Sequence, residues 1–329
     1  MADIELLPRL RFAGGLRIES TQQNVDPVDI FQSSLDPLTG AALDDTDLLP
    51  GATLTWGLNE AMNLRFAGSR TLARPEFREL APFSFADFAG GYLRVGNPTL
   101  MRSRITNLDA RWEWFPSPGA VFAVSAFYKN FTDPIEEVVY PSTEFIASWT
   151  NADGAENIGT ELEVRSALGF LTESLENLAV NVNLTLVDSE VDTGTEATVW
   201  VPGVGAVPIE IVPRLRRLQG QSPYVINAGV NWFVPSTNTA LTILYNRFGD
   251  RIAQVGTQFL PDVIEEPRDQ LDVVLQQPIT DRVDVKVAAE DILASRVEFT
   301  QGGDPLRGWT PGRVFKLQLS WQPTGQPQR

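Results

Sequence analysis

The feature that most constrains the fold of this chain is a two-residue hydrophobic period. In residues 107–114 the even positions are Leu, Ala, Trp and Trp, whereas the odd positions are Asn, Asp, Arg and Glu. This is the period of a β-strand with one apolar and one polar face. The same alternation is found in residues 9–19, 158–165, 178–186, 224–232, 271–275, 283–287 and 315–321. Because no segment shows a helical period over three turns, we predict an all-β fold.

The lengths of the connections between these segments separate two kinds of β fold. A soluble β-sandwich also has half-buried, alternating strands. Here, however, short connections alternate with long ones that are rich in Gly, Pro and Asp. The short ones are residues 58–61, 116–119, 169–177, 235–238 and 278–282, and the long ones are 21–50, 72–101, 132–156, 191–222, 249–267 and 302–312. Tight turns at one end and long loops at the other are typical of outer-membrane barrels.

We therefore predict an antiparallel up-and-down transmembrane β-barrel, or part of one, with about twelve strands. Short turns would be periplasmic and long loops extracellular. The apolar face would meet lipid and the polar face would line the lumen. Tryptophans and tyrosines near the strand ends would form an aromatic girdle, although a packed aromatic core would place them there as well.

Composition excludes several function classes. The 329-residue chain has a net charge of -16, which argues against nucleic-acid binding. It has no cysteine and no histidine, so disulfides, thiolate or imidazole metal sites and histidine-based catalysis are excluded, and no cofactor is predicted. Neither a secretory signal peptide nor an apolar run of transmembrane-helix length is visible. These two observations favour a soluble protein. The two-residue hydrophobic period and the alternation of short with long connections favour a protein of the outer membrane instead.

Several motifs resemble the TonB-dependent outer-membrane receptors. They are SRTLARPEFRELAPF at 69–83, GNPTL at 96–100, FYKNF at 127–131, NIGTELEVR at 157–165, LQGQSPYVINAGV at 218–230, YNRFGDRI at 245–252 and PGRVFKLQLSW at 311–321. The resemblance implies the carboxy-terminal part of such a barrel over residues 1–321, followed by a polar tail at 322–329. It further implies a non-enzymatic receptor that takes up a scarce ligand with energy from TonB. A ferric siderophore is the favoured ligand class over cobalamin or an oligosaccharide.

The same resemblance leaves the completeness of the barrel open. We find no counterpart in this chain of the family's plug domain, TonB box or early strands, so contact with TonB is expected only through a plug outside it. The strands at 9–19 and 315–321 are expected to be neighbours in a small closed barrel, or else open edges. The alternative function is a self-contained small barrel acting as a passive pore or adhesin. Trp321 is the candidate terminal aromatic for barrel assembly.

The connection at 72–101 is the candidate ligand loop. Six arginines surround it, although the chain as a whole is acidic. We predict that Arg74, Arg78 and Arg94, with Phe77 and Tyr92, bind an anionic, partly aromatic ligand through charge-assisted hydrogen bonds and cation–π contacts. The alternative is that these arginines pair with Glu76, Glu79 and Asp87 while the phenylalanines pack the loop on the rim. Outer-membrane lipid, including lipopolysaccharide with its phosphates, is a further expected partner.

Two acidic groups are weaker candidates for chemistry. Asp44, Asp45 and Asp47 lack the glycine and distal glutamate of a calcium loop, so a solvated acidic loop is expected there. Glu136 with Glu137, and Glu161 with Glu163, are spaced like possible glycosidase pairs. Adjacent strand residues point to opposite faces, however, and the second pair fits a lumen lining, so catalysis is not expected.

Overall fold

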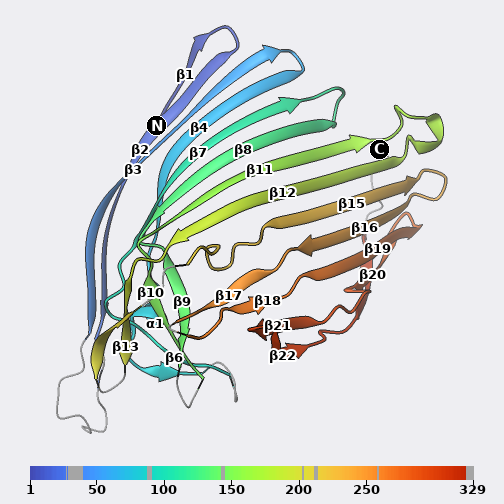
Figure 1. Ribbon diagram of the computed structural model, residues 1–329. Coiled ribbons are helices and arrows are strands. Elements are labelled where there is room, and N and C mark those ends of the chain that lie inside the picture. Colours follow the sequence, from blue (N-terminus) through green and yellow to red (C-terminus); the bar gives the residue numbers. More distant parts are fainter. Residues whose placement is uncertain are drawn as a thin grey trace.

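A single large antiparallel sheet dominates the computed structural model, which describes residues 1–26, 28, 40–86, 91–141, 145–201, 204–210, 214–257 and 259–323. We call it the main sheet. Its thirteen strands follow one another in chain order, each paired antiparallel with the next (Figure 1). They are β1 (Ala2–Leu7), β2 (Leu10–Val25), β3 (Ala41–Asn59), β4 (Met62–Ala73), β7 (Ser103–Trp114), β8 (Val121–Thr132), β11 (Gly154–Ala167), β12 (Leu178–Asp192), β15 (Tyr224–Val234), β16 (Thr239–Phe248), β19 (Arg268–Thr280), β20 (Val283–Glu290) and β23 (Val314–Trp321). The predicted up-and-down meander is confirmed.

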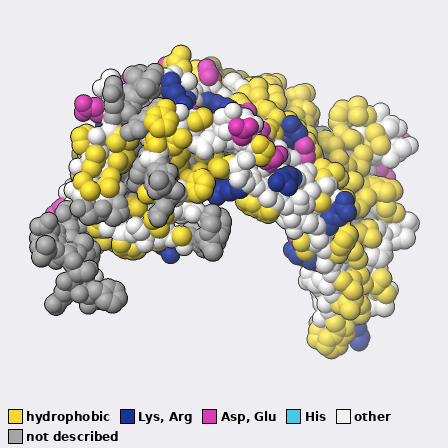
Figure 2. Space-filling view, turned by 60° about the horizontal axis from the view of Figure 1, so that its bottom comes forward, with side chains coloured by type: hydrophobic (Ala, Val, Ile, Leu, Met, Phe, Trp, Pro, Cys, Tyr) yellow, Lys and Arg dark blue, Asp and Glu magenta, His cyan; other side chains and the backbone are white. Residues whose placement is uncertain are grey.

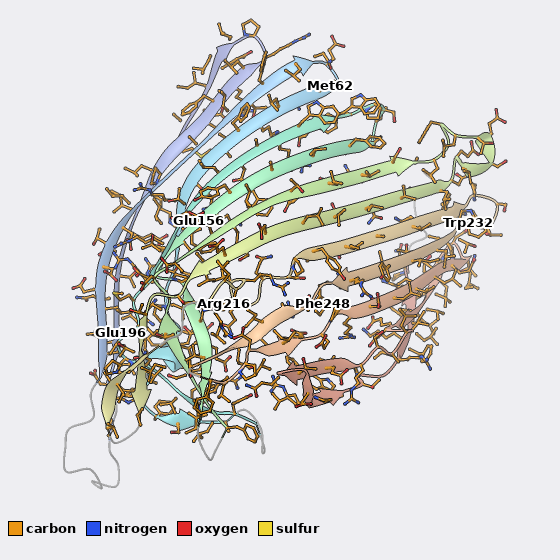
Figure 3. All side chains as sticks on the ribbon, in the orientation of Figure 1. Met62, Glu156, Glu196, Arg216, Trp232 and Phe248 are labelled. Carbon is orange, nitrogen blue, oxygen red and sulfur yellow. The ribbon has the colours of Figure 1, made fainter. Side chains whose placement is uncertain are left out.

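The connections are sorted between the two ends of the main sheet as predicted. Residues 60–61, 115–120, 168–177, 235–238 and 281–282 form short turns at the same end. In Figure 3 Met62 and Trp232 lie at this end, while Glu196 lies at the opposite, long-loop end. Within the described residues no helix is long and apolar enough to cross a bilayer.

The amino-terminal part differs from the sequence prediction in two ways. β1 precedes the first predicted strand and pairs with β2 through a turn in which Arg9 has a φ of 73°. Moreover, most of the predicted loop at 21–50 is strand, because β2 and β3 stay paired from Leu10–Trp56 up to Val25–Ala41. This hairpin is polar on both faces near its tip, so it lacks the alternation by which the other strands were recognised.

The main sheet remains open. Among the described strands, β1 pairs only with β2 and β23 pairs only with β20, so both are free edges. Of the two expectations for the first and last strands, the structure therefore has open edges. The edge strand is β1 rather than the segment at 9–19. The molecule has the form of an arch over a hollow, as Figure 2 shows.

The two faces of the main sheet have the predicted polarity. On β23 the apolar Phe315, Leu317, Leu319 and Trp321 are 68–72% exposed. Large apolar side chains at such exposure are expected to face lipid. On the other face, Arg111 bonds Glu113 at 2.9 Å and Glu163 at 2.5 Å. Four tryptophans at the short-turn end are 36–68% exposed, which favours a girdle over a packed aromatic core; they are Trp56, Trp114, Trp232 and Trp321.

The predicted long loops fold into a second layer, which we call the loop layer. Its sheet has the order β22-β21-β18-β17-β9-β10-β6-β5. These strands are β5 (Ser84–Phe85), β6 (Leu93–Val95), β9 (Ile135–Tyr140), β10 (Ile146–Asn151), β17 (Arg251–Gly256), β18 (Val263–Glu265), β21 (Val297–Gln301) and β22 (Asp304–Trp309). The hairpin β13 (Glu196–Val201) and β14 (Gly205–Glu210), the helix α1 (Phe77–Leu80) and a 3-10 turn at Glu173–Leu175 complete the elements.

The buried core lies in or against the loop layer rather than in the main sheet. One cluster joins Tyr92, Val139, Ala147, Val263, Val297 and Phe299, and another joins Val138, Val199, Ile252 and Val255. β9 pairs in parallel with β17, and β6 pairs in parallel with β10. Hydrophobic burial therefore holds together segments that are far apart in the chain and positions the candidate ligand loop.

Candidate ligand-binding site

The candidate ligand loop is anchored by the short helix α1. Glu76 precedes the helix, and its N–H donates to Oε2 of Glu79 at 2.8 Å in a reciprocal capping box. Leu80 at the end of α1 is fully buried with Leu100 and Ala41. Burial, together with the nearby carboxylates of Glu76 and Glu137, raises the pKa of Glu79 despite this hydrogen bond. The loop is thus a folded unit with its own small core.

Gly96 and Asn97 of the GNPTL motif lock the return of the loop. A Cβ on Gly96 would lie 2.1 Å from the carbonyl oxygen of Ala81, so only glycine fits. Asn97 is 1% exposed, and its Nδ2 donates to the carbonyls of Trp149 at 2.8 Å and Thr198 at 2.9 Å. The side-chain amide of Asn97 therefore joins the ligand loop to β10 and β13. This role, together with the close approach at Gly96, is a structural reason for the GNPTL motif.

An arginine and three aromatic rings lie beside α1; Arg78 and Phe83 are exposed, whereas Phe85 and Trp149 are half-buried. The guanidinium carbon of Arg78 is 5.0 Å from the ring centroid of Phe85. Phe85 stacks on Trp149, with centroids 6.1 Å apart and an interplanar angle of 18°, and also contacts Phe83. We call Arg78, Phe83, Phe85 and Trp149 the aromatic platform. Phe77, the first residue of α1, is 65% exposed and adjoins Arg78 in the chain.

The other predicted binding residues lie deeper. Nη1 of Arg74 is 2.9 Å from Oε2 of Glu19 on β2, and Nε of Arg94 is 2.9 Å from Oε1 of Glu137 on β9. Tyr92 is only 6% exposed, packs edge-on against Phe145, and has a pKa raised by its burial. The structure therefore brings Arg78 and Phe77 to the surface and places the other three within the packing of the loop.

The acidic partners that the structure shows for Arg74 and Arg94 are Glu19 and Glu137, neither of which was considered as a partner in the sequence. Glu19 and Glu137 come from other parts of the chain, whereas Glu76 and Glu79 serve the capping box. Asp87 lies outside the described residues. Sequence proximity did not reveal these pairs because strand pairing and loop packing bring the partners together.

Asp44, Asp45 and Asp47 lie on β3 rather than in a solvated loop. Arg102 pairs with both Asp45 and Asp47, and its Nε is 2.8 Å from Asp47 Oδ2. No group of three or more acidic side chains is arranged to hold a metal ion in the part of the chain that the structure describes. Asp45 and Asp47 thus fix the β2–β3 hairpin to the start of β7, whereas Asp44 accepts a hydrogen bond from Gln22 within the hairpin.

A buried ion pair that the sequence analysis missed lies where the loops leave the main sheet. Glu136 is 1% exposed and Arg216 is 7% exposed, and two hydrogen bonds of 2.7 and 2.6 Å join them. Figure 3 marks the position of Arg216. They border a cavity of about 310 Å³ together with Thr150, Thr193 and Val255. The long connection at 191–222 contains three arginines, Arg214, Arg216 and Arg217, and nothing in the sequence indicates which of them pairs with Glu136.

The glutamates considered as glycosidase pairs are distributed as the strand period requires. Glu136 bonds Arg216 while its neighbour Glu137 bonds Arg94. Glu163 bonds Arg111 on the polar face of the main sheet. Trp321 lies on the edge strand β23 opposite Val283, at the short-turn end.

Comparison with known proteins connects this architecture to one family. Residues 1–284 match the family described as TonB dependent receptor-like, beta-barrel. The iron-regulated outer membrane virulence protein of Vibrio cholerae is 22% identical over 267 residues, which make up 77% of this chain and 37% of that protein. The chain thus spans well under half of the length of this relative.

Solved structures show the same fold at low sequence identity. The ferric enterobactin receptor PfeA of Pseudomonas aeruginosa, in complex with enterobactin, aligns with a TM-score of 0.59 at 15% identity over 97% of this chain and 44% of that one. The FrpB iron transporter of Neisseria meningitidis gives a TM-score of 0.59 at 13% identity, with 97% and 44% coverage. The chain therefore belongs to the TonB-dependent receptor β-barrel family, whose members are transport receptors of the bacterial outer membrane and not enzymes.

Proposed function

We propose that this chain forms barrel strands and extracellular loops of a receptor for TonB-driven uptake, and that its ligand is an anionic ferric chelate of the siderophore type. The observation that carries the proposal is the aromatic platform, in which the exposed Arg78 and Phe83 lie beside the half-buried rings of Phe85 and Trp149 in the loop layer. The iron-related names of the relatives support the same ligand class. Contact with TonB would run through a plug domain in the lumen.

In this proposal the five predicted residues divide into two roles. Arg78 and Phe77 contact the ligand, with Phe83 and Phe85 providing flat apolar faces beside the guanidinium. A planar guanidinium binds a carboxylate, catecholate or phosphate with two hydrogen bonds, which an ammonium group does not reproduce. Arg74, Arg94 and Tyr92 hold the loop in its bound shape through Glu19, Glu137 and the buried cluster.

The open main sheet supports a receptor over a self-contained pore or adhesin. A lone pore needs a closed ring of strands, because unpaired backbone groups in hydrocarbon cost several kcal/mol each. Here β1 and β23 each have a single partner among the described strands. Their free edges are compatible with further strands of a larger barrel.

The ligand site is tested in the receptor that contains this chain. Binding of a ferric catecholate chelate would be measured by calorimetry for the wild type, Arg78→Ala and Phe85→Ala. We expect affinity to fall about tenfold or more in each variant, because a desolvated charge or a stacking face is lost. Arg296→Ala is the matched control, since Arg296 is an exposed loop-layer arginine that pairs with Glu298.

Transport is tested separately with radioactive iron in intact cells. Uptake that stops when a protonophore removes the membrane potential supports energy-coupled transport, whereas persistent uptake would indicate a passive pore. Unchanged chelate affinity in Arg78→Ala and Phe85→Ala would refute the proposed ligand surface.

A further inference from the structure

We propose that three neighbouring strands of the main sheet, β12, β15 and β16, form the surface along which an anionic ligand crosses the lumen (Figure 1). Their lumen-facing side carries five asparagines, which we call the amide wall; they are Asn181, Asn183, Asn227, Asn231 and Asn246. The inference rests on the proposed uptake function. It adds the route of the ligand inside the barrel, which the aromatic platform in the loop layer does not determine.

Strand register places the amide wall on the lumen-facing side. Asn183 pairs with Glu163 of β11 on one side and with Asn227 of β15 on the other. Asn227 in turn pairs with Asn246 of β16, so the three asparagines share the polar face to which Glu163 belongs. Residues two positions apart on a strand lie on the same face. The lumen-facing residues of β12 and β15 are therefore those with odd numbers, and those of β16 have even numbers.

The lumen-facing side of these three strands is uncharged. Over their described lengths, no Asp, Glu, Lys or Arg lies on that face of β12, β15 or β16. Every other described strand of the main sheet has at least one charged residue there. At the two borders of the amide wall these residues are Glu163 on β11 and Asp272 on β19. In a chain with a net charge of -16, three consecutive strands without a carboxylate on this face form a distinct surface.

The asparagines hold one another in place. Nδ2 of Asn246 donates to Oδ1 of Asn227 at 2.7 Å, and Nδ2 of Asn231 donates to Oδ1 of Asn181 at 3.3 Å. Gly229 makes room for Asn181, because a Cβ on Gly229 would lie 2.3 Å from that Oδ1. An amide has two N–H donors and an oxygen with two lone pairs, so these bonds leave capacity for a ligand. Asn227 and Asn231 are exposed and lie about 13 Å apart along β15.

An uncharged hydrogen-bonding surface suits an anion that has to move. A carboxylate in a narrow lumen repels the anion, and a cation holds it with hydrogen bonds about twice as strong as those of a neutral group. Passage through a pore needs contacts that are favourable enough for entry and weak enough for release, repeated at several sites. The amide wall offers such contacts on three adjacent strands. An anionic chelate on this surface meets neither a repelling carboxylate nor a cation that traps it.

The test adds negative charge to the amide wall in the whole receptor that contains this chain. Asn227→Asp with Asn231→Asp preserves the size of both side chains. We expect uptake of a radioactive ferric catecholate chelate by intact cells to fall roughly tenfold, because the new carboxylates repel the anion. Calorimetric affinity of the purified receptor for the same chelate should stay at the wild-type level. The chelate therefore still binds, and only its passage is slowed.

The matched control adds the same charge elsewhere on the lumen-facing side. Asn63→Asp with Asn107→Asp changes two asparagines that face the lumen from β4 and β7, where Asn63 pairs with Glu113 and Asn107 pairs with Ser69. Uptake in this control should stay close to the wild-type rate.

A second experiment adds the charge after folding, so that a defect in assembly is not mistaken for one in passage. Because this chain has no cysteine, Asn231→Cys and Asn107→Cys each introduce its single thiol. A negatively charged methanethiosulfonate should slow uptake in Asn231→Cys, and a reducing agent should restore it. Uncharged methyl methanethiosulfonate should have little effect, and neither reagent should slow uptake in Asn107→Cys.

Several outcomes would overturn the inference. Undiminished uptake in Asn227→Asp with Asn231→Asp, or an equal loss in the control variant, would show that the amide wall is not the route. Equal inhibition by the charged and uncharged reagents would assign the effect to bulk. A loss of calorimetric affinity would make these asparagines part of the binding site instead. Absence of uptake by the wild-type receptor would refute the proposed function itself, whereas wild-type uptake with unaffected wall variants would refute the route alone.

Discussion

Glu136 and Arg216 form a buried ion pair whose two members are 80 positions apart in the chain. Removing one member of such a pair leaves an uncompensated buried charge. We expect Glu136→Gln to destabilise the loop layer by about 3–5 kcal/mol. Hydrogen exchange of the β9 and β10 amides would measure the loss. Replacing both residues by leucine should recover most of the stability, because no buried charge remains.

The control for this prediction is an exposed pair in the same layer. Arg296 and Glu298 are 3.8 Å apart and 56% and 36% exposed. Glu298→Gln should change stability by less than about 1 kcal/mol. An effect of Glu136→Gln as small as that of Glu298→Gln would show that the buried pair does not hold the loop layer.

Gly96 is required by the close approach of two backbone segments. Gly96→Ala would place a Cβ 2.1 Å from the Ala81 oxygen and 2.7 Å from the Arg78 oxygen, both of them backbone atoms. We expect a cost of about 1–3 kcal/mol or more and a displaced ligand loop, read as faster proteolysis between residues 74 and 102. Gly51→Ala should be nearly silent, because its Cβ would meet only Ser69 at an ordinary 3.7 Å. Equal proteolysis in the two variants would contradict the steric argument.

Glu79 makes the ligand loop sensitive to pH. Burial and the neighbouring carboxylates raise its pKa, so in the pH range above about 4.3 the native loop binds more protons than the unfolded one. The free energy of unfolding therefore falls as pH rises through this range and levels off above the raised pKa. Glu79→Gln keeps a hydrogen-bond acceptor for Glu76 and should remove this part of the pH dependence. Proteolysis of the loop against pH would measure it.

The matched control for Glu79 is Glu60, which is exposed in a turn at the opposite end of the main sheet. Glu60→Gln should leave the pH profile of the ligand loop unchanged. A profile that is identical in wild type and Glu79→Gln would refute the role of Glu79.

At the scale of elements, Trp321 is one of the exposed apolar side chains of the edge strand β23. This side chain is 68% exposed at the short-turn end, where an aromatic ring anchors a strand at the membrane interface. If it also serves as the terminal aromatic for assembly, Trp321→Ala should lower the folded amount in the outer membrane several-fold. Trp232→Ala is the control, because Trp232 is a half-exposed tryptophan of an internal strand. Equal losses in the two variants would assign Trp321 to the girdle alone.

The β2–β3 hairpin shows why element boundaries were harder to predict than elements. Its outer half carries Thr, Gln, Asn and Asp on both faces, so no apolar period is present. Pairing there is supported instead by polar contacts with the backbone of the ligand loop and with Arg102, which follows it. Nε2 of Gln23 donates to the Pro75 carbonyl at 2.9 Å, and Arg102 pairs with Asp45 and Asp47. A strand stabilised by distant polar contacts leaves no local hydrophobic signal.

At the scale of the whole molecule, the two free edges of the main sheet determine its behaviour in isolation. Unpaired N–H and C=O groups on β1 and β23 cost several kcal/mol each in hydrocarbon. We therefore expect the chain expressed alone to aggregate rather than to form a compact barrel. Gel mobility in detergent, before and after heating, and protease resistance would measure this. A compact, heat-modifiable species would show that β1 and β23 close on each other.

The sequence by itself determined the local features of this protein. A period of two residues is imposed by the strand backbone, so the strands, their lipid-facing and lumen-facing sides and the tight turns at one end were predictable. The motifs shared with TonB-dependent receptors could also be recognised in the sequence, because each lies within a short stretch of chain. The sequence placed Phe77 and Arg78 in one candidate group with Arg74, Arg94 and Tyr92, and it did not separate the exposed pair from the other three.

Only the tertiary structure decided which distant residues meet. The parallel pairing of β9 with β17 joins segments more than 100 residues apart, and it buries Val138 and Val255 in one cluster. Arginine pairs with any carboxylate within reach, so neither Arg74 with Glu19 nor Arg216 with Glu136 follows from sequence spacing. The physical reason is that the two-residue period of a strand is set by the local backbone and involves only residues that are close in the chain. The partners of buried charges, in contrast, are set by the packing of loops whose own sequences carry no period.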